Sequence, residues 1–179
     1  MTRALATFSM ILIIVSSLSA QSASVGLTAS NQFVKNPDFW LSTSSNLMGT
    51  ALFISRVHYP NSAEWFGYGT QLMGIPALTL SMYDFTQNQT DFATWGNLAY
   101  ASWALGAVLV DHVFKVEYRD PLRPGIMVPY VAGYYFAIGL QAAAQYESGL
   151  IPWAIAGTCC VINTAASLYA HKKGTDFRR

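Results

Sequence analysis

A carboxylate and an imidazole stand side by side at Asp111 and His112, close to the end of a long apolar stretch. Enzymes use these two groups to move protons near neutral pH. Arg119 and Arg123 follow in the chain and carry the paired N–H donors that suit a phosphate group. The set predicts a catalytic pair, Asp111 and His112, that acts on a lipid head group. The structural alternative is an ion pair between Asp111 and Lys115, one helical turn later.

Four amide side chains form the second candidate set, each near the middle of a different apolar segment. Their spacing places each of them on the same helical face as small residues, which is the face that packs inside a bundle. Amides in that position make hydrogen bonds between helices, or they line a polar cavity that holds a lipophilic molecule or a polar substrate. The candidate ligand-binding residues are therefore Gln71, Asn97, Gln141 and Asn163.

Three histidines, His58, His112 and His171, fall at the ends of apolar segments that the chain's topology brings to one side. Imidazoles gathered there would suit a metal ion or acid–base chemistry. The alternative is that each caps the C-terminal end of a helix, where a positive charge is favourable. No two histidines have helical metal-ligand spacing, and the adjacent Cys159 and Cys160 suit small core residues better than ligands. We predict no metal site, and the sequence identifies no cofactor.

The elements that must position these residues are apolar segments of about twenty residues. Hydrophobic residues make up 53% of the 179-residue chain and charged residues only 11%, whereas about 25% of a typical soluble domain is charged. Since a bilayer is crossed by about 20 apolar residues, the sequence predicts an all-α polytopic membrane bundle with five transmembrane helices. The five predicted spans are 39–59, 64–83, 92–114, 126–146 and 150–170. Pro76 lies within the second span and predicts a kink there.

The ends of the chain complete this organisation. Residues 1–20 combine Arg3, a short apolar run and small residues, which is typical of a signal peptide; the alternative is a sixth membrane helix. Residues 21–38 form a polar extracytoplasmic linker, residues 39–171 form the bundle, and residues 172–179 form a basic cytoplasmic tail.

The distribution of Lys and Arg predicts the orientation in the membrane. If the charged loop at 110–125 is cytoplasmic, nine of the ten Lys and Arg residues fall on that side, and Lys35 falls on the other. This matches the excess of basic residues found in cytoplasmic loops and predicts a cytoplasmic C-terminus. The residues predicted to meet lipid head groups are Arg56, Lys115, Arg119 and Arg123.

The sequence therefore predicts an integral membrane protein that is not an enzyme, and that binds a lipophilic small molecule or serves as a subunit of a larger membrane assembly. The alternatives are an enzyme acting on a lipid head group at the cytoplasmic interface, and a small channel or transporter. The expected partners are membrane lipids, a lipophilic ligand and other membrane proteins. The net charge of +1 and the absence of a basic patch give no indication of nucleic-acid binding.

Overall fold

The computed structural model describes residues 36–116 and 123–173, and all regular structure in these residues is helical, which confirms the all-α prediction. The helices are α3 (Pro37–His58), α4 (Pro60–Leu72), α5 (Gly74–Thr86), α6 (Phe92–Val108), the π-helical turn η1 (Leu109–Val113), α7 (Pro124–Ala144) and α8 (Leu150–Lys172). Outside the described residues lie the predicted signal peptide or first helix at 1–20, most of the linker at 21–38, Arg119, and most of the tail at 172–179.

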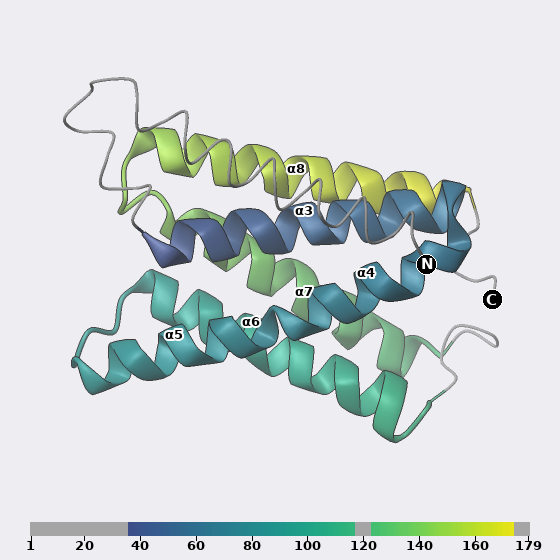
Figure 1. Cartoon of the computed structure of the whole chain (residues 1–179), viewed down its shortest axis with the longest axis horizontal. Helices are drawn as coiled ribbons and strands as arrows, with labels where there is room; N and C mark the ends of the chain where they lie inside the picture. Colours follow the sequence, from purple (N-terminus) through teal and green to yellow (C-terminus); the bar gives the residue numbers. More distant parts are fainter. Residues whose placement is uncertain (1–35, 117–122, 174–179) are drawn as a thin grey trace.

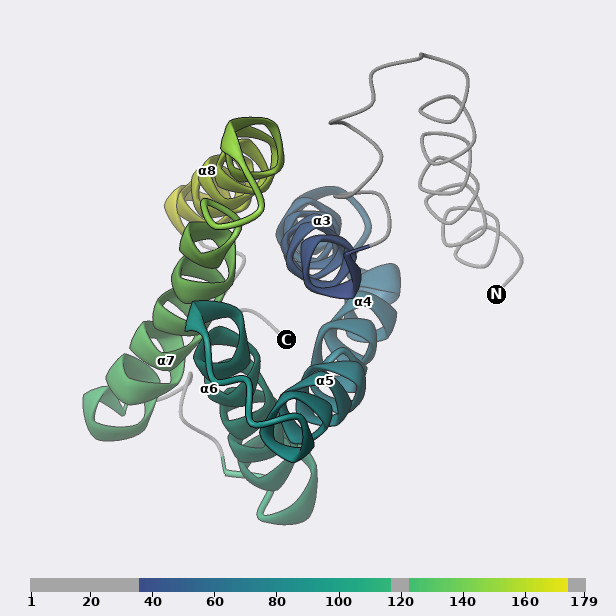
Figure 2. The same ribbon diagram turned by 90° about the vertical axis from the view of Figure 1, so that its left-hand side faces the viewer.

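The helices form a ring in which neighbours in the chain are neighbours in space (Figures 1 and 2). Helix α3 packs against α4, α5 against α6, α6 against α7 and α7 against α8, and α8 closes the ring against α3. Successive passes of the chain through the bundle run in opposite directions. Helices α4 and α5 follow one another along the same direction and together form one pass. Because the number of passes is odd, α3 and α8 run in the same direction where the ring closes.

Local chemistry explains where the helices begin and break. The side chain of Asn36 accepts hydrogen bonds from the backbone N–H groups of Asp38 and Phe39, at 2.9 and 3.4 Å, so it caps α3 at Pro37. The predicted kink near Pro76 is an interruption at Met73, between α4 and α5. Proline has no N–H to donate to the carbonyl of Leu72, four residues earlier, so a regular helix cannot run through this point.

The burial pattern differs from that of a typical soluble domain. Many buried side chains are polar, among them Ser42, Ser45, Asn46, Thr70, Asn97, Gln141 and Asn163. Large apolar side chains lie outside instead; Phe136 on α7 is 64% exposed and Val161 on α8 is 69% exposed. The interior also holds many alanines, which allow the helices to approach closely, and large side chains that include Phe39, Tyr100, Tyr134 and Ile138.

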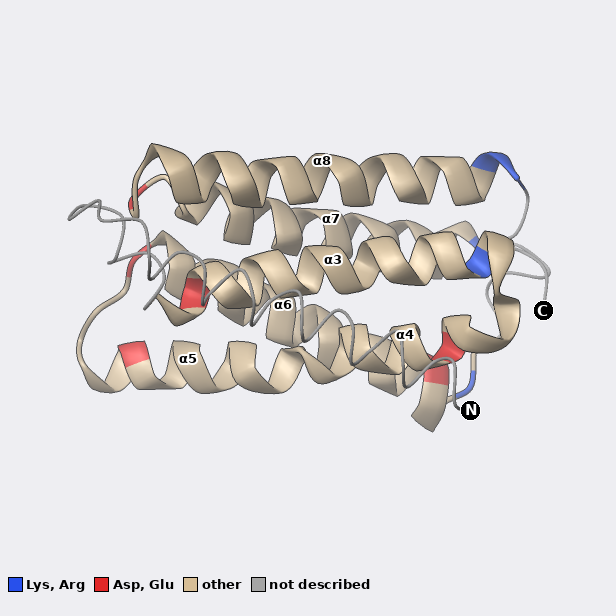
Figure 3. Ribbon diagram, turned by 45° about the horizontal axis from the view of Figure 1, so that its top comes forward, with Lys and Arg blue, Asp and Glu red and all other residues tan. Residues whose placement is uncertain are grey.

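Charged residues gather at the two ends of the bundle (Figure 3). We call one end the basic end; its described charged residues are Arg56, Glu64, Asp111, Lys115, Arg123, Lys172 and Lys173. We call the other the acidic end; its described charged residues are Asp38, Asp84, Asp91 and Glu147. No described residue between the two ends carries a charge.

Two helices, α7 and α8, are long and apolar enough to cross a membrane. The other elements depart from this pattern for identifiable reasons. Helices α4 and α5 have 13 residues each and α6 has 17, which is short of the about 20 residues that a span requires. Helix α3 has 22 residues but devotes much of its inner face to serine, threonine and asparagine.

Candidate functional site

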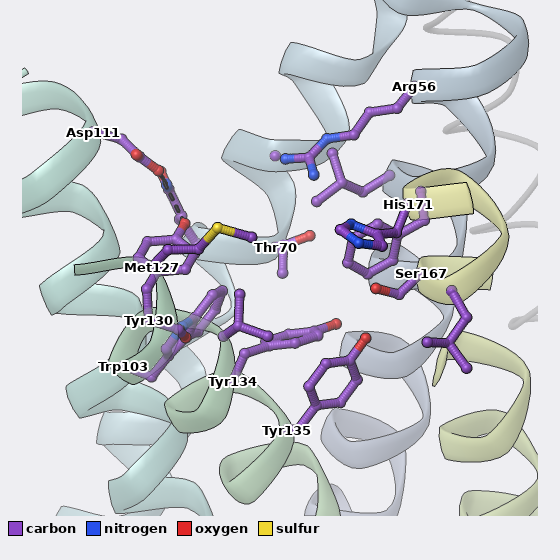
Figure 4. A pocket seen from close by; sticks show the side chains of 16 residues that line it. Arg56, Thr70, Trp103, Asp111, Met127, Tyr130, Tyr134, Tyr135, Ser167 and His171 are labelled. Atoms are coloured by element: carbon purple, nitrogen blue, oxygen red, sulfur yellow. Dashed lines mark hydrogen bonds between the residues drawn. The ribbon is translucent and has the colours of Figure 1, made fainter. Parts of the chain in front are cut away.

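A cavity of about 280 Å³ opens inside the ring at the basic end (Figure 4). Helices α3, α4, α6, α7 and α8 and the π-helical turn η1 all contribute to its walls. Its polar lining residues are Arg56, Thr70, Gln71, Asp111, Ser167 and His171, and its aromatic ones are Phe53, Trp103, Tyr130, Tyr134 and Tyr135. A few polar groups set into an apolar and aromatic wall are typical of small-molecule sites.

The carboxylate of Asp111 is held at one side of this cavity. Its Oδ2 atom accepts a hydrogen bond from the Tyr130 hydroxyl at 2.9 Å and another from the Gln71 amide at 3.2 Å. Helical structure ends at Val113, and Lys115 has a φ of +48°. The helical geometry on which the expected pairing of Asp111 with Lys115 depends is therefore absent. Two neighbouring helices fix the direction of the carboxylate instead.

Arg56 and His171 lie on the other side of the cavity from Asp111 (Figure 4). They come from the C-terminal ends of α3 and α8, the parallel pair that closes the ring. The Arg56 guanidinium stands over the ring of Phe53, 5.5 Å from its centroid, which is a favourable cation–π arrangement. The cavity thus has a carboxylate on one wall and cationic or imidazole groups on the opposite wall.

Aromatic rings form the floor between these walls. The Trp103 and Tyr134 rings lie 4.7 Å apart between centroids, and the Trp103 and Tyr130 rings lie 5.8 Å apart. The indole N–H of Trp103 donates to the backbone carbonyl of Tyr130 at 3.0 Å. These contacts tie α6 to α7 and keep the polar edges of the rings satisfied.

The predicted catalytic neighbours, Asp111 and His112, are connected through Gln71. The Gln71 amide donates to Asp111, and its Oε1 atom lies 2.8 Å from Nε2 of His112. The His112 ring is exposed and stacks on Tyr68 at 5.1 Å. Asp111 lines the cavity wall, whereas His112 does not. The structure brings the two side chains into one hydrogen-bonded chain but gives them different surroundings.

The three histidines do share the basic end, but they do not converge. His58 stacks on Tyr169 at 6.2 Å, His112 stacks on Tyr68, and His171 lines the cavity. Within residues 36–116 and 123–173, no three His, Cys, Asp or Glu side chains come together in a group able to hold a metal ion.

The amide candidates divide between two places. Asn97 and Gln141 lie in the half of the bundle nearer the acidic end, where the Gln141 amide donates to Asn97 Oδ1 at 2.9 Å. Ser45 donates to Gln141 Oε1 at 3.1 Å, and the Asn97 amide donates to Asp38 at 2.6 Å. These bonds join α3, α6 and α7 and fill the space between them. Gln71 lies at the basic end and lines the cavity.

Asn163 joins these two regions. Its amide donates to the Tyr134 hydroxyl at 2.7 Å and to Asn46 Oδ1 at 3.3 Å, and Tyr134 is also part of the cavity wall. Gly49 makes this meeting of α3, α7 and α8 feasible. A Cβ atom at position 49 would overlap the Tyr134 hydroxyl and lie 2.8 Å from the Asn163 amide.

The acidic end has its own electrostatic feature at Asp38. Partial burial raises the pKa of the Asp38 carboxyl above its ordinary value of 3.8; the hydrogen bond from Asn97 opposes this, and the Asp84 and Asp91 carboxylates add to it. Asp38 stands in the first turn of α3, just before the apolar part of that helix.

Of the predicted head-group residues, Arg56 lines the cavity, Lys115 and Arg123 are exposed at the basic end, and Arg119 lies outside the described residues. The sequence analysis did not select Trp103, Tyr130 or Tyr134 as site residues. For the two tyrosines the available signal was their spacing, because Tyr130 and Tyr134 lie 11 and 7 residues before Gln141 and so share its helical face. No such spacing marks Trp103.

Comparisons with known proteins give no guide to this arrangement. No family model matches the chain, and neither curated proteins nor solved structures yield a match.

Proposed function

We propose that this chain is an integral membrane protein whose five helical passes cross the bilayer and whose cavity at the basic end binds an amphiphilic molecule. The burial pattern supports the first part of this proposal. Water would make the exposed apolar side chains of α5, α7 and α8 costly, whereas lipid tails accommodate them. Hydrogen bonds between buried serine, asparagine and glutamine side chains are the usual means of fastening helices within a membrane.

The spacing of the charges supports the same placement. Helix α8 has 23 residues, which corresponds to about 35 Å at about 1.5 Å per residue, and its described charges begin only at Lys172. A bilayer's hydrocarbon core is about 30 Å thick. The α4–α5 pair and α6 with its π-helical turn run between the same two ends (Figure 3), so each acts as one pass in this proposal.

The basic end is assigned to the cytoplasm in this proposal. All described Lys and Arg side chains lie there, whereas the acidic end carries only carboxylates among its described charged residues. Excess positive charge is the feature that fixes cytoplasmic loops during insertion. The C-terminus then lies in the cytoplasm, as α8 ends at the basic end (Figure 1).

The position of the cavity is the observation that carries the binding function. Its apolar and aromatic floor lies within the charge-free band, whereas Arg56, Asp111 and His171 stand where that band meets the charged end. A molecule with an apolar body and a polar head would match both environments at once. A cavity of about 280 Å³ suits a small molecule or a head group, because it lies near the lower end of the range of about 300 to 1,000 Å³ that is typical of ligand sites.

A pair of matched substitutions on α7 tests this function. Val131 lines the cavity, whereas Val128, one turn earlier, is exposed and does not. We expect Val131→Trp to fill the cavity and Val128→Trp to leave it unchanged. Native mass spectrometry of protein extracted in a mild maltoside detergent should then show a bound lipophilic mass on the wild type and on Val128→Trp only. The same bound mass on folded Val131→Trp would contradict the proposal.

An enzyme acting on a lipid head group is the second candidate, and the bridge made by Gln71 between Asp111 and His112 favours it. Such an enzyme needs both the carboxylate and the imidazole to move a proton. Asp111→Asn and His112→Ala should each abolish turnover of a supplied phospholipid while leaving the helical content intact. For the binding function, Asp111→Asn should matter and His112→Ala should not, since His112 is not part of the cavity wall.

A further inference from the structure

The cavity contains opposite charges on opposite walls, and this determines the head group that suits it. We propose that it takes a zwitterionic lipid head group, with a cationic ammonium on the Asp111 side and a phosphate on the Arg56 and His171 side. This inference rests on the proposed function, which concerns binding of an amphiphile in general, and adds the chemistry of the polar part.

The Asp111 side has the chemistry that recognises an ammonium. The carboxylate is oriented by Tyr130 and Gln71 through bonds of 2.9 and 3.2 Å to Oδ2. Tyr130 carries the hydroxyl that donates to this carboxylate, and the Trp103 ring packs against the Tyr130 ring at 74°. Aromatic faces attract organic cations, quaternary ammonium groups above all, and a neighbouring carboxylate adds charge attraction.

The Arg56 side has the chemistry that recognises a phosphate. A guanidinium offers a planar fork of N–H donors that fits two phosphate oxygens. The guanidinium carbon of Arg56 lies 5.5 Å from the centroid of the Phe53 ring, and the side chain lines the cavity. His171 lies beside it across the cavity from Asp111 (Figure 4) and contributes a second nitrogen-bearing side chain.

The walls also provide an exit for an acyl chain. Val131 on α7 and Leu168 on α8 both line the cavity and are both exposed on the outer surface of the bundle. In this proposal the acyl chain leaves the cavity between these two side chains. At about 280 Å³ the cavity is too small to enclose a whole lipid, so the head group would lie inside and the chain would leave through this side.

Lysolipids with the same acyl chain test the head group without changing the apolar part. Native mass spectrometry in maltoside micelles would measure the affinity of the full chain for lysophosphatidylcholine, lysophosphatidylglycerol and the matching monoacylglycerol. We expect the zwitterionic lysolipid to bind about tenfold more tightly than the anionic or the neutral one, as one charge-assisted contact is worth about that factor. Phosphocholine without a chain should bind weakly, because the bilayer lipid, not a soluble zwitterion, is the proposed source.

Two substitutions sharpen the assignment of the walls. Asp111→Asn should lower the affinity for lysophosphatidylcholine about tenfold and leave that for lysophosphatidylglycerol nearly unchanged. Arg56→Gln should weaken both phosphate-containing lysolipids by a similar factor. The measurements on the wild type stand even if a variant does not fold.

The outcomes separate this inference from the function on which it rests. Equal affinity for the three head groups would overturn the zwitterion assignment and leave an amphiphile site in place. Tight binding of chain-free phosphocholine would overturn the lipid source. No binding of any lysolipid, together with an unchanged bound mass on Val131→Trp, would overturn the proposed function itself.

Discussion

The space inside the helical ring is filled in one half and open in the other. Near the acidic end, Asn97, Gln141 and Ser45 are fully buried and satisfy one another across three helices. Near the basic end, Gln71, Asp111 and Tyr130 are also hydrogen-bonded, yet a cavity of about 280 Å³ remains beside them. Similar polar side chains on inward faces thus do two things in one bundle. They fasten helices where partners face each other at contact distance, and they line a site where larger aromatic residues hold the helices apart.

The largest loss of stability should come from disrupting the packing at the junction between the two halves. Gly49→Ala places a methyl group against the Tyr134 hydroxyl and the Asn163 amide, which belong to the junction of α3, α7 and α8. We expect a loss of about 3 kcal/mol in the free energy of unfolding, near the upper end for overpacking, measured by denaturant titration in detergent. Gly157→Ala on α8 is the control, because a Cβ there meets nothing within 4 Å. A Gly49→Ala variant as stable as Gly157→Ala would show that this junction is loosely packed.

The second largest effect should be a loss of stability that is confined to the filled half, near the acidic end. Asn97→Leu removes the bonds to Gln141 and Asp38 and leaves both partners partly or fully buried without them. We expect a loss of about 2 kcal/mol in the free energy of unfolding, while the lipid mass bound per folded molecule stays unchanged. Asn61→Leu, at an exposed position of α4, is the matched control. A marked loss of bound lipid from folded Asn97→Leu would mean that the two halves do not act separately.

Substitution of Gln71 should have the reverse effect, with little loss of stability but weaker lipid binding. Gln71→Leu removes the amide that orients Asp111 in the cavity wall but disturbs no buried junction. We expect less than about 1 kcal/mol of lost stability and an affinity for lysophosphatidylcholine reduced about tenfold, measured by the same native mass spectrometry. A variant that loses stability and keeps its affinity would place Gln71 with the fastening residues.

The smallest effect concerns the pH dependence of the filled half. Because partial burial, together with Asp84 and Asp91, raises the pKa of Asp38 in the folded protein, the folded state binds the proton more tightly than the unfolded state. The resulting stabilisation is complete below the ordinary pKa of 3.8 and is lost as the pH rises through the folded-state pKa. Asp38→Asn should reduce the pH dependence of stability in this range, measured as thermal unfolding midpoints from acidic to neutral pH. If the pH dependence of Asp38→Asn equals that of the wild type, other titrating groups cause it.

Helix positions and the distribution of charge follow from the sequence, because both depend on local composition. The predicted segment at 150–170 corresponds closely to α8, Leu150–Lys172, and Pro76 marks the interruption at Met73. The separate roles of Gln71 and Asn97 do not follow, although both are amides on inward faces. Their roles depend on their partners and surroundings: Asn97 bonds to the buried Gln141, whereas Gln71 bonds to the Asp111 carboxylate in the wall of a cavity. The pairing of Asp111 with Lys115 was expected from spacing, but it required a helix that ends at Val113.

The proposed binding site depends on the placement of the bundle across a membrane. The accessibility of single cysteines to a labelling reagent tests this placement directly. In a chain with Cys159 and Cys160 replaced by alanine, Gln87→Cys would report on the acidic end, Lys173→Cys on the basic end and Val161→Cys on the band between them. A membrane-impermeant maleimide applied to intact cells should label Gln87→Cys, label Lys173→Cys only after permeabilisation, and leave Val161→Cys unlabelled in both conditions. Labelling of Gln87→Cys and Lys173→Cys from the same side, or of Val161→Cys as readily as the other two, would contradict a bundle that crosses the bilayer in five passes.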